Sequence, residues 1–274
     1  MTIAVVWQED GRQWCAADTR LVVHDDKRTT DIATKIYSIP VTASIMVPGS
    51  IARVSYYRAE FGFMYAGAAL PASMVAVTAS TLLQKLVYPG IPSEPPHFEE
   101  VASFVCGLSK HFMAERRQHG GEANGIFSAA FFGWCWHSKV YKLAHINGRD
   151  DAGSFRVEMN YPPVPEKDGD PWLVFGSGST KFNETLTAYR AAEEPITKRI
   201  PQRIIDKMVT GETDPAVGGA TSVGAVYQGA FELFFAAEPI TPGQPDARRI
   251  YNGLDLDTDV EGIGRYFVGL NGLA

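Results

Sequence analysis

The sequence is poor in several features that mark large classes of protein. Its 274 residues include three cysteines, Cys15, Cys106 and Cys135, which form no CxxC pair. A scattered and odd set of cysteines excludes a disulfide framework and favours buried, reduced thiols, as in a cytoplasmic protein. The six histidines form no HExxH arrangement, so we expect neither a metal site nor a cofactor.

An excess of positive charge is also lacking. Twenty-five Lys and Arg against thirty-one Asp and Glu give a net charge of -6, and no basic run exceeds two residues. Nucleic acid is therefore not expected as a partner, because phosphate binding needs a clustered basic face. The Gly/Ser segment at residues 176–181 lacks the GxxxxGK[ST] spacing of a phosphate-binding loop, so nucleotide binding is not expected either.

The sequence shows no pattern of a secretory signal and no clear membrane span. The first residues, Met-Thr-Ile-Ala-Val-Val-Trp, carry no basic region and no small-residue cleavage site. Residues 61–84 carry no charge, but Gly62, Gly67 and Pro71 interrupt them. Such a stretch indicates a buried strand, a turn and a helix and not a membrane span. We expect a soluble, cytoplasmic protein with no membrane partner.

Strand and helix patterns alternate in blocks along the chain. Two apolar runs, at residues 3–7 and 13–17, flank a turn at Gly11 and predict a hairpin. Its antiparallel pairing places Thr2 near Asp18. Further strands are predicted at residues 35–39, 43–47, 51–57, 63–66, 125–136 and 139–145, with a pair formed by 155–159 and 172–175. Helices are predicted at residues 71–86, 99–119, 181–194 and 202–210.

This order of elements predicts an α+β fold. Each block of strands needs one face covered by helices and the other face buried elsewhere. Two sheets stacked face to face with helices outside meet both needs, which gives a four-layer αββα sandwich. No linker separates two self-sufficient cores, so residues 1–274 are expected to form a single domain.

Three residues, Thr2, Asp18 and Lys35, make a chemically coherent group. A threonine hydroxyl is a poor nucleophile unless a base removes its proton. Removal of Met1 would give Thr2 a free α-amine, which titrates near about 7.7–8 and can act as that base. A nearby lysine would favour the neutral amine, and a carboxylate would balance the lysine once it is buried.

Several short segments carry a family resemblance. They are Thr-Ile-Ala-Val-Val at 2–6, Cys-Ala-Ala-Asp-Thr-Arg at 15–20, Lys-Ile-Tyr-Ser-Ile at 35–39, Met-Tyr-Ala-Gly-Ala-Ala at 64–69, Phe-Gly-Trp at 132–134, Phe-Gly-Ser-Gly-Ser at 175–179 and Asp-Pro-Ala-Val-Gly-Gly at 214–219. In order and rough spacing they resemble proteasome β subunits and the simpler bacterial proteasome-like threonine peptidases. These are N-terminal-nucleophile hydrolases, and the resemblance covers most of residues 2 to about 220. It implies the same αββα sandwich.

The resemblance also implies catalytic roles. Thr2 matches the family nucleophile, and Asp18 and Lys35 match its supporting pair. Gly67 matches the glycine whose backbone N–H stabilises the tetrahedral oxyanion, a role that needs close backbone approach. Two further residues match those that hold the terminal amine in place: Ser177 and Asp214.

A specificity pocket is implied in the same way. Its lining would be formed by Leu21, Ala33, Tyr65 and Ala69. Tyr65 would shorten this pocket, which predicts a preference for small or medium apolar side chains.

The chain also departs from the family pattern. Val217 stands where the family usually has a Ser or Thr, three residues after Asp214, which removes one hydroxyl from the surroundings of the amine. An inserted hairpin is expected at about residues 41–62, near the substrate cleft or the ring interior. An extended segment at about residues 232–274 has no counterpart.

The resemblance finally implies partners and rivals. The expected substrate is a peptide or unfolded protein, and the expected assembly is a homo-oligomeric ring, with an ATP-dependent unfoldase as a further partner. Two alternatives stay open. One is a catalytically silent, proteasome-like structural subunit, which Val217 and a retained Met1 would favour. The other is a small-molecule amidase of the same N-terminal-nucleophile class.

Overall fold

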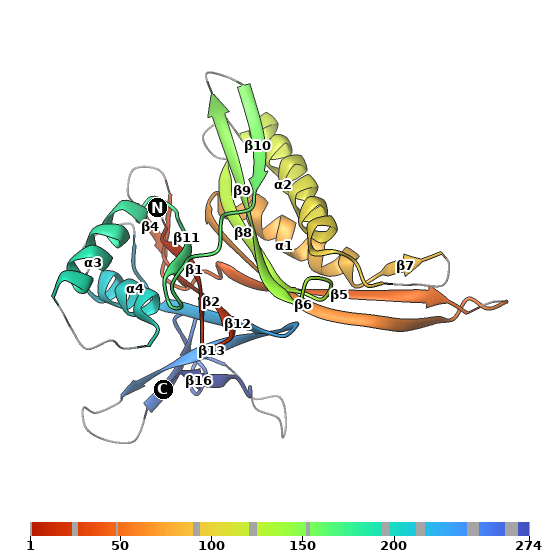
Figure 1. Ribbon diagram of the computed structural model, residues 1–274. Coiled ribbons are helices and arrows are strands. Elements are labelled where there is room, and N and C mark those ends of the chain that lie inside the picture. Colours follow the sequence, from red (N-terminus) through yellow and green to blue (C-terminus); the bar gives the residue numbers. More distant parts are fainter. Residues whose placement is uncertain are drawn as a thin grey trace.

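The described part of the chain folds into two large sheets and four helices, with one small two-stranded sheet (Figure 1). This computed structural model describes residues 2–23, 27–47, 49–89, 94–120, 125–151, 154–192, 198–211, 217–239, 247–260 and 268–273. Within them it is a mixed α+β fold, as the order of sequence patterns predicts.

The first large sheet, sheet I, contains eight strands. Seven follow one another in the order β11 (Pro171–Phe175), β1 (Ala4–Glu9), β2 (Arg12–Asp18), β12 (Thr221–Tyr227), β13 (Ala230–Pro239), β14 (Ala247–Tyr251) and β15 (Leu254–Asp255). The eighth, β16 (Asn271–Leu273), pairs in parallel with β13. Sheet I therefore joins the two ends of the described chain.

The second large sheet, sheet II, contains six strands. Their order is β10 (Ser154–Asn160), β9 (Val140–Asp151), β8 (Phe127–Cys135), β6 (Arg53–Gly67), β5 (Ile36–Met46) and β7 (Leu86–Tyr88). A short hairpin of β3 (Leu21–Val23) and β4 (Lys27–Thr30) links the two large sheets along the chain.

Four helices cover the outer faces. They are α1 (Ala69–Leu83), α2 (Phe98–Gly120), α3 (Ser179–Ala191) and α4 (Ile200–Thr210). Figure 1 shows α1 and α2 alongside sheet II and α3 and α4 beside β1 and β11. The buried apolar clusters between these helices and sheets show which parts pack against each other.

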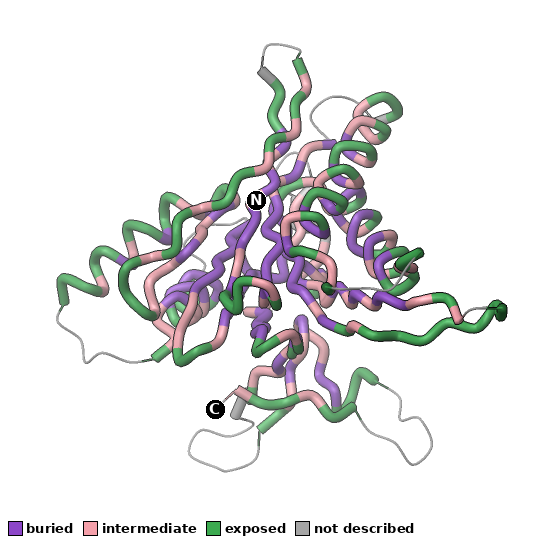
Figure 2. Tube along the Cα trace, turned by 45° about the vertical axis from the view of Figure 1, so that its right-hand side comes forward, coloured by how far each residue is buried: buried purple, intermediate pink, exposed green. Residues whose placement is uncertain are grey.

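Three buried apolar clusters hold these parts together. One lies between α1, α2 and sheet II, one between sheet I and α3, α4, and one between the two sheets. Strand β1 shows how the sequence produces this arrangement, because side chains alternate across a strand. Ile3 and Val5 join the cluster under α3 and α4, whereas Ala4 and Val6 join the cluster between the sheets. Figure 2 shows this buried interior along the strands and the exposed outer turns of the helices.

Most predicted elements are present, with two corrections. Residues 155–159 and 172–175 do not pair with each other: β10 pairs with β9 in sheet II, and β11 pairs with β1 in sheet I. The separate strands predicted between residues 35 and 66 are two long ones, β5 and β6. Pro40 does not break β5, and it lies opposite Glu60 of β6 in the ladder.

The long β5–β6 hairpin contains the segment predicted as an insertion. Its outer part extends away from the body of the molecule (Figure 1). Residues 53–56 of β6 are exposed there, whereas Phe61 and Phe63, nearer the body, are buried. The C-terminal segment predicted from residue 232 onward supplies the end of β13 and the strands β14 to β16 at one edge of sheet I. Among the described helices, none has the length and apolar character needed to cross a bilayer.

Candidate active site

The N-terminal residues meet Lys35 where the two large sheets face each other. The β1–β2 hairpin pairs Ala4 with Ala17, so Ile3 and Asp18 follow in register, and the Asp18 N–H donates to the Ile3 carbonyl at 3.3 Å. This places Thr2 at the end of sheet I beside Asp18, as the hairpin predicts. Lys35 comes from the other sheet, directly before β5.

The side chains of Thr2, Asp18 and Lys35 are in direct contact. Lys35 Nζ donates to Thr2 Oγ1 at 3.0 Å and to Asp18 Oδ1 at 2.9 Å. Lys35 and Asp18 are both 0% exposed, and Thr2 is 3% exposed. A buried ammonium is tolerated only when it is paired and hydrogen-bonded. Both contacts of Lys35 therefore help to hold its charge in this interior.

Asp18 is saturated with donors. Its Oδ1 accepts from Lys35 and from the Ile3 N–H at 3.0 Å, while Oδ2 accepts from the N–H groups of Arg20 and Gly218, both at 3.3 Å. Hydrogen bonds to the charged form stabilise a carboxylate. Asp18 thus both balances Lys35 and fixes the start of β1 relative to the chain around residue 218.

Burial governs the proton on Lys35. It lowers the pKa of the Lys35 ammonium below its ordinary value; the charge and hydrogen bond of Asp18 act in the opposite direction, and the charge of Arg20 lowers the pKa further. A lysine of this kind gives up its proton more readily than one in water. The group that faces Thr2 Oγ1 is therefore the Lys35 amine, with a pKa below that of an ordinary lysine.

The turn before α3 closes around the backbone of Thr2. The Thr2 nitrogen donates to Ser177 Oγ at 3.2 Å, and the Gly178 N–H donates to the Thr2 carbonyl at 3.2 Å. Gly176 has a φ of +95°, and a Cβ there would lie 2.2 Å from the Thr2 carbonyl oxygen. Only glycine fits this conformation and this spacing. Ser177 thus lies at the nitrogen of Thr2.

Gly67 ends β6 close to this group. Its φ is +111°, and a Cβ would lie 2.8 Å from the Ile126 carbonyl oxygen. The side chain of the preceding residue, Ala66, faces Gly176, because a Cβ added at Gly176 would lie 3.2 Å from the Ala66 Cβ. Gly67 therefore follows a residue that faces the turn around Thr2, and a side chain at Gly67 would collide with the backbone of Ile126 and Phe127.

Two residues of the last motif stand differently in the structure. Asp214 lies outside the described residues. Val217 is fully buried in the apolar cluster under α3 and α4, together with Ile3. It brings a methyl-bearing side chain and no hydroxyl to this neighbourhood, while the adjacent Gly218 supplies an N–H to Asp18.

Sequence reasoning missed the hydrogen bonds and the ion pair that Thr19 and Arg20 form next to Asp18. Arg20 pairs with Asp31 at 2.8 Å and also donates to the Val217 carbonyl at 3.5 Å. Its guanidinium packs on Gly218, where a Cβ would lie 2.3 Å from the guanidinium carbon. Thr19 Oγ1 adds hydrogen bonds to the Asp31 carbonyl and the Ala220 N–H. The Asp-Thr-Arg run at residues 18–20 was the available signal, but it also suits an ordinary turn.

The predicted pocket residues are placed on four different segments. Tyr65 is buried, and its hydroxyl donates at 3.3 Å to the Thr34 carbonyl, between Ala33 and Lys35 in the chain. Ala33 is nearly buried, and its N–H donates to the Thr19 carbonyl at 2.9 Å. Leu21 begins β3 and Ala69 begins α1. Their joint role as a specificity pocket stays a prediction.

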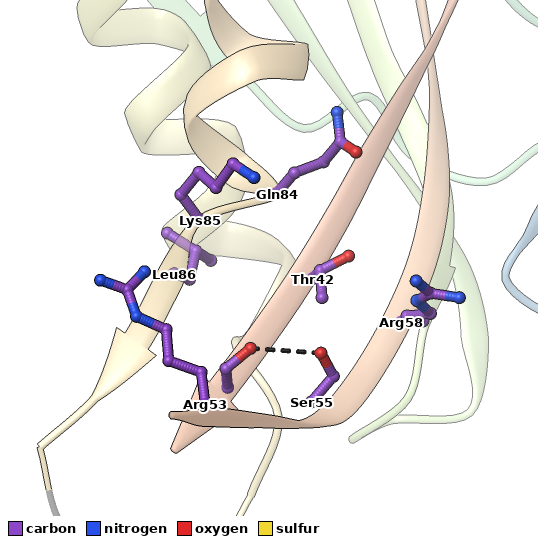
Figure 3. Close-up of a pocket in the computed structure, with 8 residues that line it drawn as sticks. Thr42, Arg53, Ser55, Arg58, Gln84, Lys85 and Leu86 are labelled. Atoms are coloured by element: carbon purple, nitrogen blue, oxygen red, sulfur yellow. Dashed lines mark hydrogen bonds between the residues drawn. The ribbon is translucent and has the colours of Figure 1, made fainter. Parts of the chain in front are cut away.

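A separate hollow lies under the β5–β6 hairpin. It has a volume of about 280 Å³, and the hydroxyls of Ser44 and Ser55 lie 3.2 Å apart in its wall (Figure 3). Figure 3 shows Arg53 and Arg58 extending in different directions, so their charges do not converge on one point. Its lining includes none of the residues around Thr2. The hollow is thus separate from the cluster of Thr2, Asp18 and Lys35.

The comparisons with known proteins concern the fold. No protein-family model matches the chain, and no curated protein matches it. Among solved structures, the chain is similar to Anbu (ancestral beta-subunit) from Yersinia bercovieri, with a TM-score of 0.51 and 14% sequence identity over 81% of this chain and 80% of that chain. An identity of this size speaks for the fold alone. The chain therefore has the mixed α+β fold of an ancestral proteasome β-subunit, which confirms the predicted resemblance at the level of the fold.

Proposed function

We propose that this chain is a threonine-type peptidase or amidase whose nucleophile is Thr2 after removal of Met1. The observation that carries the proposal is the buried contact of Lys35 with both Thr2 Oγ1, at 3.0 Å, and Asp18, at 2.9 Å. A charged lysine beside a hydroxyl favours loss of the hydroxyl proton. The same lysine would keep a free α-amine on Thr2 neutral, and a neutral amine can act as a base.

The reaction follows from these roles. The α-amine of Thr2 takes the proton from Oγ1, and Oγ1 forms a bond to the substrate carbonyl carbon. The oxyanion of the tetrahedral intermediate is stabilised by backbone N–H groups that include Gly67. The amine returns its proton to the leaving nitrogen as the C–N bond breaks. Water, deprotonated by the same amine, then hydrolyses the ester on Thr2.

Ser177 acts as a positioning residue in this proposal. It contacts the Thr2 nitrogen at 3.2 Å, the atom that becomes the amine once Met1 is removed. A hydrogen bond there orients the amine toward its own hydroxyl. Asp214 is proposed to contribute to the same environment on the strength of the sequence resemblance.

Assembly and substrate belong to the same proposal. The four-layer αββα sandwich is the architecture of N-terminal-nucleophile hydrolases, and we infer that copies of the chain assemble into a ring that encloses the sites. A peptide or unfolded protein would be the substrate in the cytoplasm, delivered by an ATP-dependent unfoldase. Tyr65, at the proposed pocket, would favour small or medium apolar side chains. Comparable cleavage of fluorogenic peptides led by acidic or basic residues would refute this preference.

A second candidate is a structural subunit with an unused site. Val217 favours it, because its buried valine side chain stands where the family has a hydroxyl near the amine. In that case the Thr2, Asp18 and Lys35 cluster would serve stability alone. A small-molecule amidase remains the third reading of the same chemistry.

The mass of the mature protein and covalent labelling distinguish these functions. Protein purified from its native host should lack one methionine, and a β-lactone should add one label per chain at Thr2. The variant Thr2→Ala should lose the label, Thr2→Ser should keep part of it, and Lys35→Met should lose it while Lys27→Met keeps it. A retained methionine together with no label in the wild type would refute the peptidase and support the structural subunit.

A further inference from the structure

A cluster of potential metal ligands lies at the start of α2, outside the Thr2 site. One ligand atom from each of Glu94, His97 and His137 falls within 4.8 Å of the other two. Glu94 Oε2 lies 3.6 Å from His97 Nε2 and 3.3 Å from His137 Nδ1. Adjacent ligands of a tetrahedral metal with bonds of about 2.0–2.1 Å are separated by roughly 3.3 Å. The carboxylate is therefore at ligand spacing from both histidines.

The backbone around the cluster holds the ligands in place. His97 directly precedes α2, and its N–H donates to Glu100 Oε2 at 2.8 Å, which fixes the first turn as a capping residue does. Two prolines, Pro95 and Pro96, separate Glu94 from His97 and restrict the backbone between them. The two donors from this segment are thus carried on a short, stiff connection into the helix.

His137 is oriented from the other side by the chain itself. Its Nε2 lies 2.7 Å from the Pro95 carbonyl oxygen, which can only accept, so Nε2 carries a proton; in the neutral ring Nδ1 is then the lone-pair nitrogen, and it faces Glu94. Histidine ligands of metals commonly donate their second N–H to a carbonyl in this way, which fixes the tautomer. This is a second feature that suits a ligand, in addition to the clustering.

The two imidazole rings lie close and parallel, with centroids 3.5 Å apart and planes 9° from parallel. A metal lies near the plane of each imidazole that binds it, so the rings must splay by rotation about the side chain of His97. The side chain of His97 is 48% exposed, which leaves room for this rotation, whereas His137 is 17% exposed and anchored. The site is thus one fixed imidazole, one adjustable imidazole and one exposed carboxylate.

We propose that Glu94, His97 and His137 bind a divalent transition-metal ion, with Zn²⁺ as the ion that suits two imidazoles and one carboxylate. Solvent would complete the coordination, because three protein donors leave a position open. The ion would add a link between the start of α2 and the turn between β8 and β9, which the Pro95–His137 hydrogen bond and the stacked rings of His97 and His137 already bring together. Its effect would be to clip this helix onto sheet II, independently of the chemistry at Thr2.

The test uses full-length, tag-free protein stripped of metal. Co²⁺ should produce the ligand-field absorption of a low-symmetry site, and calorimetry with Zn²⁺ should give one equivalent per chain. Zn²⁺ at a hundredfold excess over its Kd should raise Tm by about 5–10 °C. His97→Ala and His137→Ala should each weaken Zn²⁺ binding at least about tenfold.

The chain offers a matched control at the other end of the same helix. His119 and Glu115 form an exposed His–Glu pair at 3.2 Å, without a second histidine in the described residues around it. His119→Ala should leave Zn²⁺ binding and the Tm rise unchanged. Circular dichroism would show whether His137→Ala keeps its fold. If His137→Ala does not fold, His97→Ala still tests the site, because His97 is exposed and its loss should not disturb the fold. An absence of Co²⁺ absorption in the wild type, or Zn²⁺ binding that survives His97→Ala, would overturn the proposal.

Discussion

Replacing Asp18 with asparagine tests whether Lys35 is held as a buried cation. Asp18→Asn keeps the shape of the side chain and removes its charge. One of the two oxygens becomes an NH₂ group, although all four contacts of the carboxylate are with donors, from Ile3, Arg20, Lys35 and Gly218. Two of these donors then face another donor instead of an acceptor, and the ammonium loses its counter-charge in a fully buried place.

The expected cost is large for a single substitution. Removing one partner of a buried ion pair typically costs about 3–5 kcal/mol. A donor left without an acceptor adds about 1–3 kcal/mol, but the two contributions overlap because Lys35 is itself one of the donors. We therefore expect Asp18→Asn to lower the free energy of unfolding by about 3–5 kcal/mol.

A double-mutant cycle separates the charge from the packing. Urea denaturation followed by circular dichroism would measure the wild type, Asp18→Asn, Lys35→Met and the double variant. The double variant removes both charges, so it should be more stable than Asp18→Asn alone, with a coupling energy of about 1–3 kcal/mol. Thr2→Ala, which removes a hydroxyl and a methyl group from the same cluster but leaves both charges, should cost about 1–2 kcal/mol.

The pH dependence of the free energy of unfolding provides a second, independent test. Because burial lowers the pKa of Lys35 in the folded state, the unfolded chain binds more protons between that lowered pKa and about 10.4, and stability rises with pH in this window. Asp18 raises the pKa of Lys35, so Asp18→Asn lowers that pKa further and widens the pH window. The loss of stability caused by Asp18→Asn should therefore shrink as pH rises. A cost below about 1 kcal/mol, or a deficit that grows with pH, would refute the buried cation.

Three further predictions concern the glycines, the nucleophile and its amine. Gly176→Ala should lower the free energy of unfolding, measured by urea denaturation, by about 1–3 kcal/mol more than Gly49→Ala. Both glycines have positive φ, but only a Cβ at Gly176 would meet a neighbouring atom, the Thr2 carbonyl oxygen at 2.2 Å. Equal losses of stability would contradict this packing. Thr2→Ser in the mature protein should retain peptide hydrolysis at a reduced rate, and Thr2→Ala should abolish it, as fluorogenic substrates would report. Hydrolysis should rise with pH through the titration of the α-amine, near about 7.7–8 or lower because of Lys35, and a pH-independent rate in this range would exclude the amine as base.

Local patterns predicted the parts of the fold that depend on nearby residues. The alternation in residues 3–7 and 13–17 identified the first hairpin, and the helical stripe at 99–119 corresponds to α2. Partners that are distant in sequence were harder. Nothing within residues 171–175 distinguishes a strand that pairs with β1 from one that pairs with β10, because strand pairing uses backbone N–H and C=O groups that every strand offers.

The candidate site shows the same division. Thr2 and Asp18 follow from hairpin register, but Lys35, Gly67 and Ser177 were assigned from the family resemblance, since no periodic pattern brings residues of different sheets together. The Arg20–Asp31 pair escaped prediction because its signal also fits a turn. The cluster of Glu94, His97 and His137 escaped because its third member lies 40 residues away from the second, in a turn with no metal-binding spacing.

The long sequence separation of the contacts around Thr2 has a consequence for maturation. The Thr2 nitrogen meets Ser177, 175 residues later, and Asp18 meets Gly218, 200 residues later. A ribosome adding about 5–20 residues per second needs roughly 10–40 s to synthesise such a stretch. During this interval the beginning of the nascent chain lacks the groups that later enclose it. If Thr2 is the nucleophile that we propose, removal of Met1 is therefore expected in this interval, before folding buries Thr2.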